Sequence, residues 1–314
     1  MRTMCACLAL AFMPVLTESS RADENAVAWE ASSSDDCFVA TSQGKTLAVY
    51  RATANPKKPY LEQLFTPAGK QVLLDSPADH VHHHGLMFAL SVDDVSYWEE
   101  SDSGGGQTVV ETNATSNGML SQSLHWIDPQ GNTKLDEQRR IVLTQTADVT
   151  WLTWQSTLTV PATLDEVRLG GSHYYGLGMR FIRSLDSVAS FRFPEAAVAE
   201  AVRGTEKLTR TEWVACVGQV DEKSVTVAMF GHPENVRNPT WWFTMDEPFA
   251  YQSATLNLWK QPLTLARNDA LALTFGVALM DGDVPAEQIE SLYTHWLTNL
   301  ANHPSVPSLP RSSK

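Results

Sequence analysis

The chain is poor in cysteine and in positive charge. Four of its 314 residues are Cys, and 23 Lys and Arg stand against 36 Asp and Glu, which gives a formal net charge of -13 and a pI near 5.1. Its sequence contains no run of basic residues. Because the nucleic-acid backbone is bound by concentrated Lys and Arg, we predict that this protein has no nucleic-acid partner.

Three widespread nucleotide-binding and hydrolase motifs are also missing. The sequence has no Gly-x-Gly-x-x-Gly, no Walker loop and no Gly-x-Ser-x-Gly. A glycine run, Gly104-Gly105-Gly106, lies between two expected strands and is not followed by a helical pattern. These absences argue against a dinucleotide-binding domain, a P-loop NTPase and a serine hydrolase built on a nucleophile elbow.

Long apolar stretches are confined to the N-terminus. Arg2 precedes an apolar segment from Cys5 to Leu16, and small residues near Ala22 offer a cleavage site. The segment is interrupted by Pro14 and is shorter than the ~20 residues of a spanning helix. We therefore predict a signal peptide over residues 1–22, a periplasmic or extracellular location, and no membrane span.

Removal of that peptide would leave two cysteines, Cys37 and Cys216. In an oxidising compartment they could form one disulfide that joins an early strand to a late one. They could equally be two buried thiols, and the sequence does not decide between these alternatives.

The dominant pattern after the N-terminus is an alternation of polar and apolar residues with period two. It is rich in Thr, Val and Trp, as in half-buried antiparallel strands. Turn residues such as Asn117-Gly118 separate the segments. The clearest expected strands are 46–50, 107–111, 140–144, 149–160, 213–219, 224–230, 241–245 and 270–280. The pattern predicts an all-β protein, specifically a large antiparallel β-sandwich.

One helix is expected, at the C-terminal end. Pro285 would lie in its first turn, and Ile289, Leu292 and Trp296 recur at helical spacing. Its apolar stripe is typical of packing against a sheet. We predict a single β-sandwich domain over residues 27–303 and a flexible Pro- and Ser-rich tail over 304–314.

The least probable feature is a histidine run, Asp79-His80-Val81-His82-His83-His84-Gly85. If the segment is extended, His80, His82 and His84 share one face and His83 points to the other. Three imidazoles on one face could hold a metal ion or transfer protons. The alternative is a turn whose histidines only bond the nearby backbone.

Two further segments offer groups suited to a sugar. Trp98 and Glu99 place an aromatic ring beside a carboxylate, and sugars bind by stacking on rings and hydrogen bonding to acids. A glycine-rich segment carries His173, Tyr175 and Arg180, which are an acid/base, a hydroxyl and a fixed cation. The structural alternatives are a packed strand end for the first segment and a buried ion pair for Arg180.

A third segment follows an expected strand and reads His232-Pro233-Glu234-Asn235. Its prolines fix the shape of a loop, and rigid loops on β scaffolds often carry sites. His232 and Asn235 are therefore candidate site residues, although a turn-stabilising role explains His232 equally well.

The order of these motifs resembles a family of secreted bacterial proteins known as methane oxygenase PmoA, also described as a domain of unknown function. The resemblance covers roughly residues 40–300, and its most specific parts are the histidine run and His232-Pro233-Glu234-Asn235. The matching segments are 58–60, 64–69, 79–86, 97–98, 177–181, 232–235 and 239–241. The resemblance implies a β-rich extracytoplasmic protein. In the family pattern Pro precedes the paired histidines, so Val81 departs from it and His84 occupies a variable place.

The leading hypothesis is a secreted carbohydrate-active enzyme on a β-sandwich similar to the galactose-mutarotase supersandwich. In it His80, His82, His173, Arg180 and His232 are catalytic candidates, and Trp98, Glu99, Tyr175 and Asn235 bind the substrate. Isomerisation, elimination and hydrolysis all remain open, and hydrolysis would need two carboxylates such as Glu99 and Glu234.

Two alternatives belong to other functional classes. One is a non-catalytic glycan-binding protein. The other is a copper- or metal-dependent oxidoreductase, in which His80 and His82 would hold a divalent metal ion, because histidines at i and i+2 chelate copper or zinc. The methane-oxygenase label itself does not imply methane oxidation here, because that enzyme is an integral membrane protein and this chain has no predicted span.

Overall fold

The computed structural model describes residues 26–32, 37–52 and 57–300. The predicted signal peptide (1–22) and tail (304–314) lie outside the described residues, and the domain limits 27–303 stay a prediction. In the described ranges the chain forms 22 strands in three sheets, a short 3-10 turn η1 (Arg183–Leu185) and one helix α1 (Ala286–Leu300). Every strand pairing is antiparallel. The predicted large antiparallel β-sandwich with one C-terminal helix is confirmed.

The largest sheet joins the first strands of the chain to several late ones. In spatial order it contains β1 (Ala28–Ala31), β2 (Cys37–Ser42), β3 (Lys45–Arg51), β4 (Tyr60–Leu64), β5 (Leu86–Ala89), β13 (Gly176–Arg180), β20 (Tyr251–Thr255), β19 (Thr240–Met245), β16 (Lys207–Thr211) and β15 (Ala199–Ala201). The histidine run lies in the loop between β4 and β5, near the middle of this sheet.

The second sheet carries most of the strands that the period-two pattern predicts. In spatial order it contains β14 (Ser190–Arg192), β17 (Trp213–Val220), β18 (Lys223–Gly231), β22 (Ala270–Asp281), β11 (Val149–Thr159), β10 (Thr133–Gln145), β9 (Met119–Ile127) and β8 (Gly106–Ala114). In β9 buried and half-buried residues alternate strictly, as one face covers the core.

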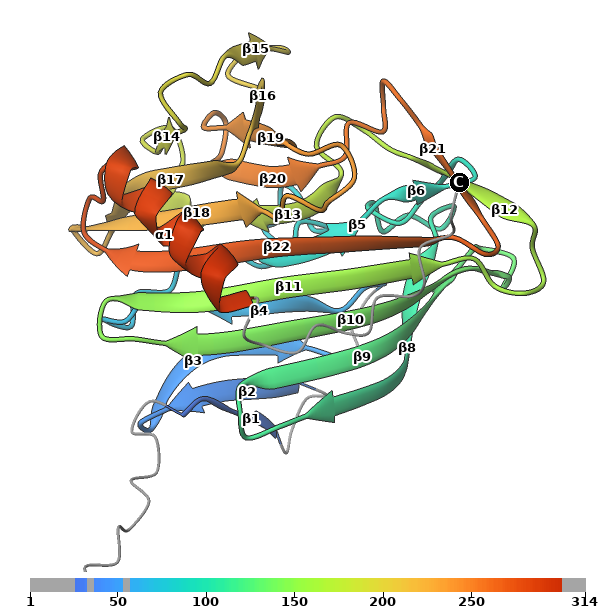
Figure 1. The fold of residues 1–314 in the computed structure, drawn as a ribbon, viewed down its shortest axis with the longest axis horizontal. Coiled ribbons are helices and arrows are strands. Elements are labelled where there is room, and N and C mark those ends of the chain that lie inside the picture. Colours follow the sequence, from blue (N-terminus) through green and yellow to red (C-terminus); the bar gives the residue numbers. More distant parts are fainter. Residues whose placement is uncertain (1–25, 33–36, 53–56, 301–314) are drawn as a thin grey trace, which may run out of the picture.

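A small third sheet lies at one end of the molecule (Figure 1). It contains β21 (Leu263–Ala266), β12 (Glu166–Gly170), β6 (Ser91–Val92) and β7 (Val95–Ser96). β7 leads directly into Tyr97, Trp98 and Glu99, so this sheet positions one of the candidate segments.

The main core lies between the two large sheets. Phe88 of β5 meets Trp126 of β9 with ring centroids 5.9 Å apart, which shows that Phe88 faces the second sheet. A network of charged groups is also buried there, in which Arg139 donates to both oxygens of Glu137 and to the Tyr50 hydroxyl. Both charged side chains of that pair have no exposed surface.

The helix α1 covers the other face of the second sheet, in front of β22 and β18 (Figure 1). Ile289, Tyr293 and Trp296 are its buried residues, and they belong to a second apolar cluster with Trp213 and Phe230. The predicted packing of the helix against a sheet is confirmed. None of the helices in the described part of the chain has the length and apolar character that crossing a membrane requires.

The two cysteines retained after the predicted cleavage are free thiols in this structure. Cys37 and Cys216 are both buried, and burial raises the pKa of the Cys216 thiol well above its ordinary value. The second of the two alternatives that the sequence left open therefore describes the structure.

One face of the ten-stranded sheet points away from the core and carries the candidate site. Residues in register across strands share a face, and Phe88 pairs with Leu177 on the core side. The alternate set, in which Met87 pairs with Gly178 and Gly178 with Ser253, therefore points outward. Arg180 and Tyr251, which are also paired, lie on this outer face.

Candidate functional site

The histidine run forms consecutive turns rather than a strand. The amide of His80 donates to the carbonyl of Pro77 at 2.8 Å, and the amide of His83 donates to the carbonyl of His80 at 2.9 Å. The predicted alternation of faces is therefore wrong, because the chain is still turning when it passes through the histidines. It straightens only after Gly85, where an added Cβ would lie 2.2 Å from the carbonyl oxygen of Leu61.

Three of the four imidazoles pack against one another. The ring centroids of His80 and His83 are 4.7 Å apart and stacked, those of His82 and His83 are 4.7 Å apart, and those of His80 and His82 are 6.0 Å apart. His83 is buried, whereas His80 and His82 are partly exposed. Phe249 closes the cluster from the side of the sheet, 4.8 Å from His80. The cluster thus offers two accessible imidazoles above an apolar floor.

His80 is oriented by a neighbouring carboxylate. Its Nδ1 lies 3.2 Å from Oδ2 of Asp79, and Arg183 donates to the other oxygen, Oδ1, at 3.1 Å. Hydrogen bonds from its own backbone amide, from His80 and from Arg183 lower the pKa of Asp79 to about 2. A carboxylate bound to one ring nitrogen fixes the orientation of the imidazole and leaves Nε2 for chemistry.

His82 and His83 are held in the neutral form. Burial lowers the pKa of His82, and the nearby charges of Lys58 and His80 lower it further, against the opposing effect of Glu99 and Glu100. Burial also lowers the pKa of His83 to about 2. A neutral, partly exposed imidazole such as that of His82 can accept a proton near pH 7.

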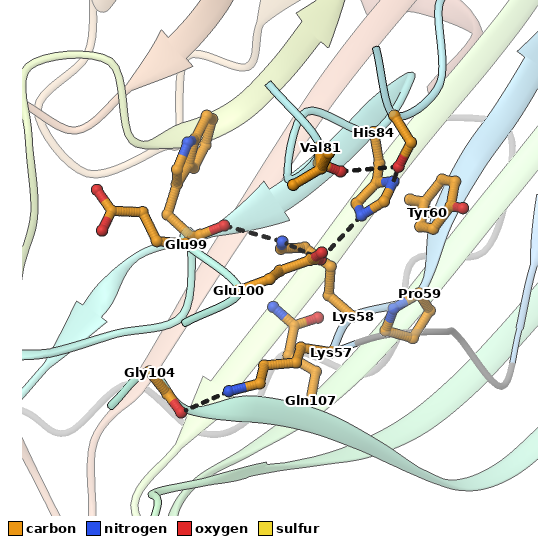
Figure 2. Close-up of polar contacts among 12 residues, drawn as sticks. Lys57, Lys58, Pro59, Tyr60, Val81, His84, Glu99, Glu100, Gly104 and Gln107 are labelled. Atoms are coloured by element: carbon orange, nitrogen blue, oxygen red, sulfur yellow. Dashed lines mark hydrogen bonds and ion pairs between the residues drawn. The ribbon is translucent and has the colours of Figure 1, made fainter. Parts of the chain in front are cut away.

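His84 leaves the cluster and joins a buried network of charges (Figure 2). Its Nδ1 lies 2.7 Å from Oδ1 of Asp75 and its Nε2 lies 2.8 Å from Oε1 of Glu100. Lys58 donates to the same Glu100 oxygen at 2.8 Å and to the carbonyl of Trp98 at 2.9 Å. The Lys58 side chain has no exposed surface and that of Glu100 has 6%. We name these four residues, Lys58, Asp75, His84 and Glu100, the buried charge network.

Opposing effects set the charges in this network. Burial disfavours charge on His84, but hydrogen bonds to Asp75 and Glu100 outweigh it and raise the pKa of His84. Burial also lowers the pKa of Lys58, against the attraction of Glu100. Burial raises the pKa of Glu100, but the hydrogen bonds and charges of His84 and Lys58 outweigh that effect and lower the pKa. The network therefore anchors Glu100, and through the chain it anchors the adjoining Trp98 and Glu99.

Trp98 is buried, and one face of its indole is covered. The ring of Tyr175 stacks on it with centroids 4.9 Å apart and planes 9° apart, and Trp98 has no exposed surface. The sugar-stacking role expected for Trp98 thus has no exposed ring face in this structure. Glu99, in contrast, is exposed and points away from the buried charge network (Figure 2). The Tyr175 hydroxyl lies 3.5 Å from Oε1 of Glu99.

Several buried polar atoms around these rings have no hydrogen-bond partner among the described residues. They are Nδ1 of His83, Nε1 of Trp98 and the hydroxyl of Tyr251. The centroids of these rings lie 5.5 to 6.4 Å from one another. Gly178 makes room for this packing, because a Cβ there would lie 1.8 Å from the Tyr251 hydroxyl. Each unpaired buried polar group lowers the stability of a folded protein by about 1–3 kcal/mol, so three of them in contact call for an explanation.

Arg180 lies beside the histidines but is already neutralised. Its two terminal nitrogens donate to the two carboxylate oxygens of Asp186 at 2.9 and 3.3 Å, and its guanidinium lies 4.2 Å above the Phe249 ring. The side chain is 1% exposed. It resembles the buried ion pair that the sequence left open as the structural alternative.

His173 lies further along the same outer face. Its Nε2 is 3.0 Å from Oε2 of Glu206, and Arg203 donates to both oxygens of that carboxylate. The His173 ring lies 5.1 Å from Tyr174 and 5.3 Å from Phe243. It is therefore connected to the Trp98 region through Tyr174, whose ring is 5.5 Å from that of Trp98.

His232 and Asn235 are not brought to the histidine run. The His232 ring is 6.1 Å from Trp296 of α1, on the helix-covered side of the second sheet. Asn235 exchanges two hydrogen bonds with the backbone of Thr274 on β22, at 2.7 and 2.8 Å. Contacts of this kind fix a loop, and Glu234 of the same loop does not join Glu99.

The metal ligands predicted for His80 and His82 do not form a ligand set. His80 directs Nδ1 to Asp79, and no group of three or more His, Cys, Asp or Glu side chains in the described ranges is arranged to hold a metal ion. The metal-binding role of His80 and His82 therefore stays a prediction.

Two surface cavities lie elsewhere. One, of about 500 Å³, is lined by residues including Lys57, Asp102 and Asp128, and the other, of about 680 Å³, lies beside Arg192 and the start of α1. None of the site histidines lines either cavity.

Sequence reasoning missed the partners of the histidines. Asp79 could have been found, because it directly precedes His80 in the motif. Lys58 had a weaker signal, as the second of two lysines between Pro56 and Pro59, just before a strand. Phe249 and Tyr251 had none, because only the pairing of β20 with β13 brings them to the site.

Comparison with known families gives a clear assignment over residues 38–294, which match the model of a family of unknown function, DUF6807. The chain belongs to this family. No curated protein matches the sequence. The methane-oxygenase label receives no support from these comparisons.

Solved structures with a related outline share little sequence with this DUF6807 chain. A galactose mutarotase related enzyme from Lactobacillus acidophilus is 7% identical, with 80% of this chain and 96% of that chain covered and a TM-score of 0.38. A protein described as "Putative aldose 1-epimerase" from Escherichia coli K12 is 12% identical, with coverages of 79% and 96% and a TM-score of 0.35.

Proposed function

We propose that this protein is a carbohydrate-active enzyme that opens and closes the ring of a reducing sugar by proton transfer at His80 and His82. The observation that carries the proposal is the pair of partly exposed imidazoles, 6.0 Å apart, with Asp79 fixing one ring and a lowered pKa on the other. Acid and base groups at such a spacing can act on two oxygens of one sugar ring.

Ring opening needs one proton acceptor and one proton donor. His82, neutral near pH 7, takes the proton of the anomeric hydroxyl. His80, whose Nδ1 lies 3.2 Å from Oδ2 of Asp79, gives a proton from Nε2 to the ring oxygen. The bond between the anomeric carbon and the ring oxygen then breaks, which leaves an open-chain aldehyde. Closure on either face reverses these steps and interconverts the anomers.

Other residues bind the sugar. Glu99 is an exposed carboxylate in electrostatic reach of His82, and it is suited to accept hydrogen bonds from sugar hydroxyls.

The same geometry supports hydrolysis and elimination less well. Hydrolysis uses two carboxylates flanking the bond, and the pair considered from sequence, Glu99 and Glu234, is not assembled. Elimination of an acidic sugar calls for a cation at the substrate carboxylate, and Arg180 already gives both terminal nitrogens to Asp186. Ring opening requires neither group.

The test uses NMR exchange spectroscopy of the anomers of glucose, galactose, maltose and cellobiose. His80→Gln and His82→Gln are each expected to lower the exchange rate of the accepted sugar by about a hundredfold or more. His125→Gln is the matched control, because His125 also binds an aspartate, at 2.6 Å, but on β9. Equal rates in all four proteins would overturn the proposal.

Non-catalytic glycan binding is the second candidate function. It is favoured by the partial exposure of His80 and His82 and by the exposed carboxylate of Glu99 near them. It predicts that the sugars bind to the wild-type protein without anomer exchange above the rate in buffer.

We also propose that residues 1–22 direct export, so that the enzyme acts in the periplasm or outside the cell. The apolar segment after Arg2 supports this proposal. N-terminal sequencing of the protein from the periplasmic fraction should start near residue 23, and an intact Met1 in the cytoplasmic fraction would contradict it.

A further inference from the structure

Trp259 is an exposed aromatic side chain on a protein that buries nearly all its large apolar groups. Among the described residues, five large apolar side chains are exposed, of which four are valines and the fifth is Trp259, at 41%. It lies in the loop between β20 and β21, outside every element that the proposed reaction uses. Single exposed apolar residues are common, so its position relative to the site decides its meaning.

Trp259 is connected to the histidine cluster by a series of ring contacts. The ring centroids are 5.5 Å apart for Trp259 and His173, 5.1 Å for His173 and Tyr174, and 5.5 Å for Tyr174 and Trp98. A further 6.4 Å separates Trp98 from His83. These rings form a continuous series on the outer side of the ten-stranded sheet, in which Trp98 and His83 are buried and Trp259 is the exposed end.

We infer that Trp259 is a saccharide-binding subsite and that the substrate is a reducing oligosaccharide rather than a free monosaccharide. The inference rests on the proposed function. A single sugar ring bound at His80 and His82 is too short to span the four ring-to-ring contacts that lead to Trp259. A later sugar unit of an oligosaccharide bound at the same histidines reaches Trp259. The apolar face of that unit stacks on the indole.

The polar groups around Trp259 suit a sugar unit. Lys260 lies over the indole, 5.1 Å from its centroid, and pairs with Glu200 at 3.6 Å. Both side chains are about half exposed, so the ammonium can turn from the ring to a hydroxyl without loss of a buried contact. The His173 ring centroid lies 5.5 Å from that of Trp259, and Glu206 holds Nε2 of His173 at 3.0 Å.

The experiment compares binding and anomer exchange for glucose, cellobiose and cellotriose, and for glucose, maltose and maltotriose. Trp259→Ala is expected to weaken binding of the accepted trisaccharide about tenfold, which is about 1.4 kcal/mol, and to leave glucose unchanged. Trp259→Phe should restore part of the loss because it keeps a ring. Val110→Ala removes exposed apolar surface on β8 and serves as the control.

The outcomes separate this inference from the proposed function. A length-dependent loss in Trp259→Ala, with exchange still abolished by His82→Gln, supports both. Equal affinity of wild type and Trp259→Ala for every length overturns the subsite, while the effect of His82→Gln would preserve the proposed reaction. A wild-type protein that binds none of these saccharides contradicts both.

Discussion

Replacement of Lys58 should destabilise the protein more than replacement of any other lysine among the described residues. The side chain has no exposed surface and its ammonium is shared between Glu100 and the carbonyl of Trp98. Breaking a buried pair by removal of one partner costs about 3–5 kcal/mol, because the other charge stays buried. His84 still bonds Glu100 in the variant, which places the expected loss for Lys58→Met at the lower end, about 3 kcal/mol.

The assay is urea unfolding at pH 7, followed by tryptophan fluorescence. The control is Lys70→Met, the same chemical change in an exposed pair, since Lys70 lies 3.0 Å from an Asp221 whose side chain is 78% exposed. Pairs of that kind contribute about 0–1 kcal/mol. The midpoint should therefore fall much further for Lys58→Met than for Lys70→Met.

A double variant tests the physical reason. In the double variant Lys58→Met, Glu100→Gln the buried carboxylate is absent as well, so no buried negative charge is left without the Lys58 ammonium. We expect the double variant to lose at least about 1 kcal/mol less than the sum of the two single losses. The reasoning is refuted if Lys58→Met behaves like Lys70→Met, or if the two single losses simply add.

Two further predictions concern His83 and Gly178. The pKa of His83 is about 2 in the folded protein, so between pH 6.5 and pH 5 the unfolded chain gains a proton there that the folded chain does not. Wild type should lose about 1.6 kcal/mol over this interval that His83→Gln retains, measured by urea unfolding at both pH values; parallel losses would contradict it. Gly178→Ala should lower stability by about 1–3 kcal/mol, because its Cβ would lie 1.8 Å from the Tyr251 hydroxyl. Gly170→Ala, whose Cβ meets only Ser91 at 4.0 Å, should change thermal unfolding little, and equal shifts would argue against the clash.

Much of the fold could be predicted because its signals are local. The alternation in 149–160 corresponds to β11 (Val149–Thr159), and that in 270–280 to β22 (Ala270–Asp281). The helical spacing after Pro285 corresponds to α1 (Ala286–Leu300). Each pattern needs only neighbours a few residues apart, since burial on one face repeats with the period of the element.

The site was predictable only in part, because its geometry depends on distant segments. His80 and His82 do lie together, but the expected three-histidine face fails because the run turns. His84 was the member that the resemblance made doubtful, yet it is bonded to Asp75 and Glu100. His232 illustrates the opposite error: a histidine at a strand end looks like a site residue until the sheets place it beside the helix.

The most direct test of the central claim is the pH dependence of anomer exchange in wild type and His82→Gln. Burial lowers the pKa of His82 from 6.5, so the base stays active below that pH and is lost only as His82 takes up a proton. We predict a wild-type rate that holds at pH 6.5 and falls at lower pH, and a low rate without this acid limb in His82→Gln. An identical acid limb in both proteins would contradict the role of His82 as the base.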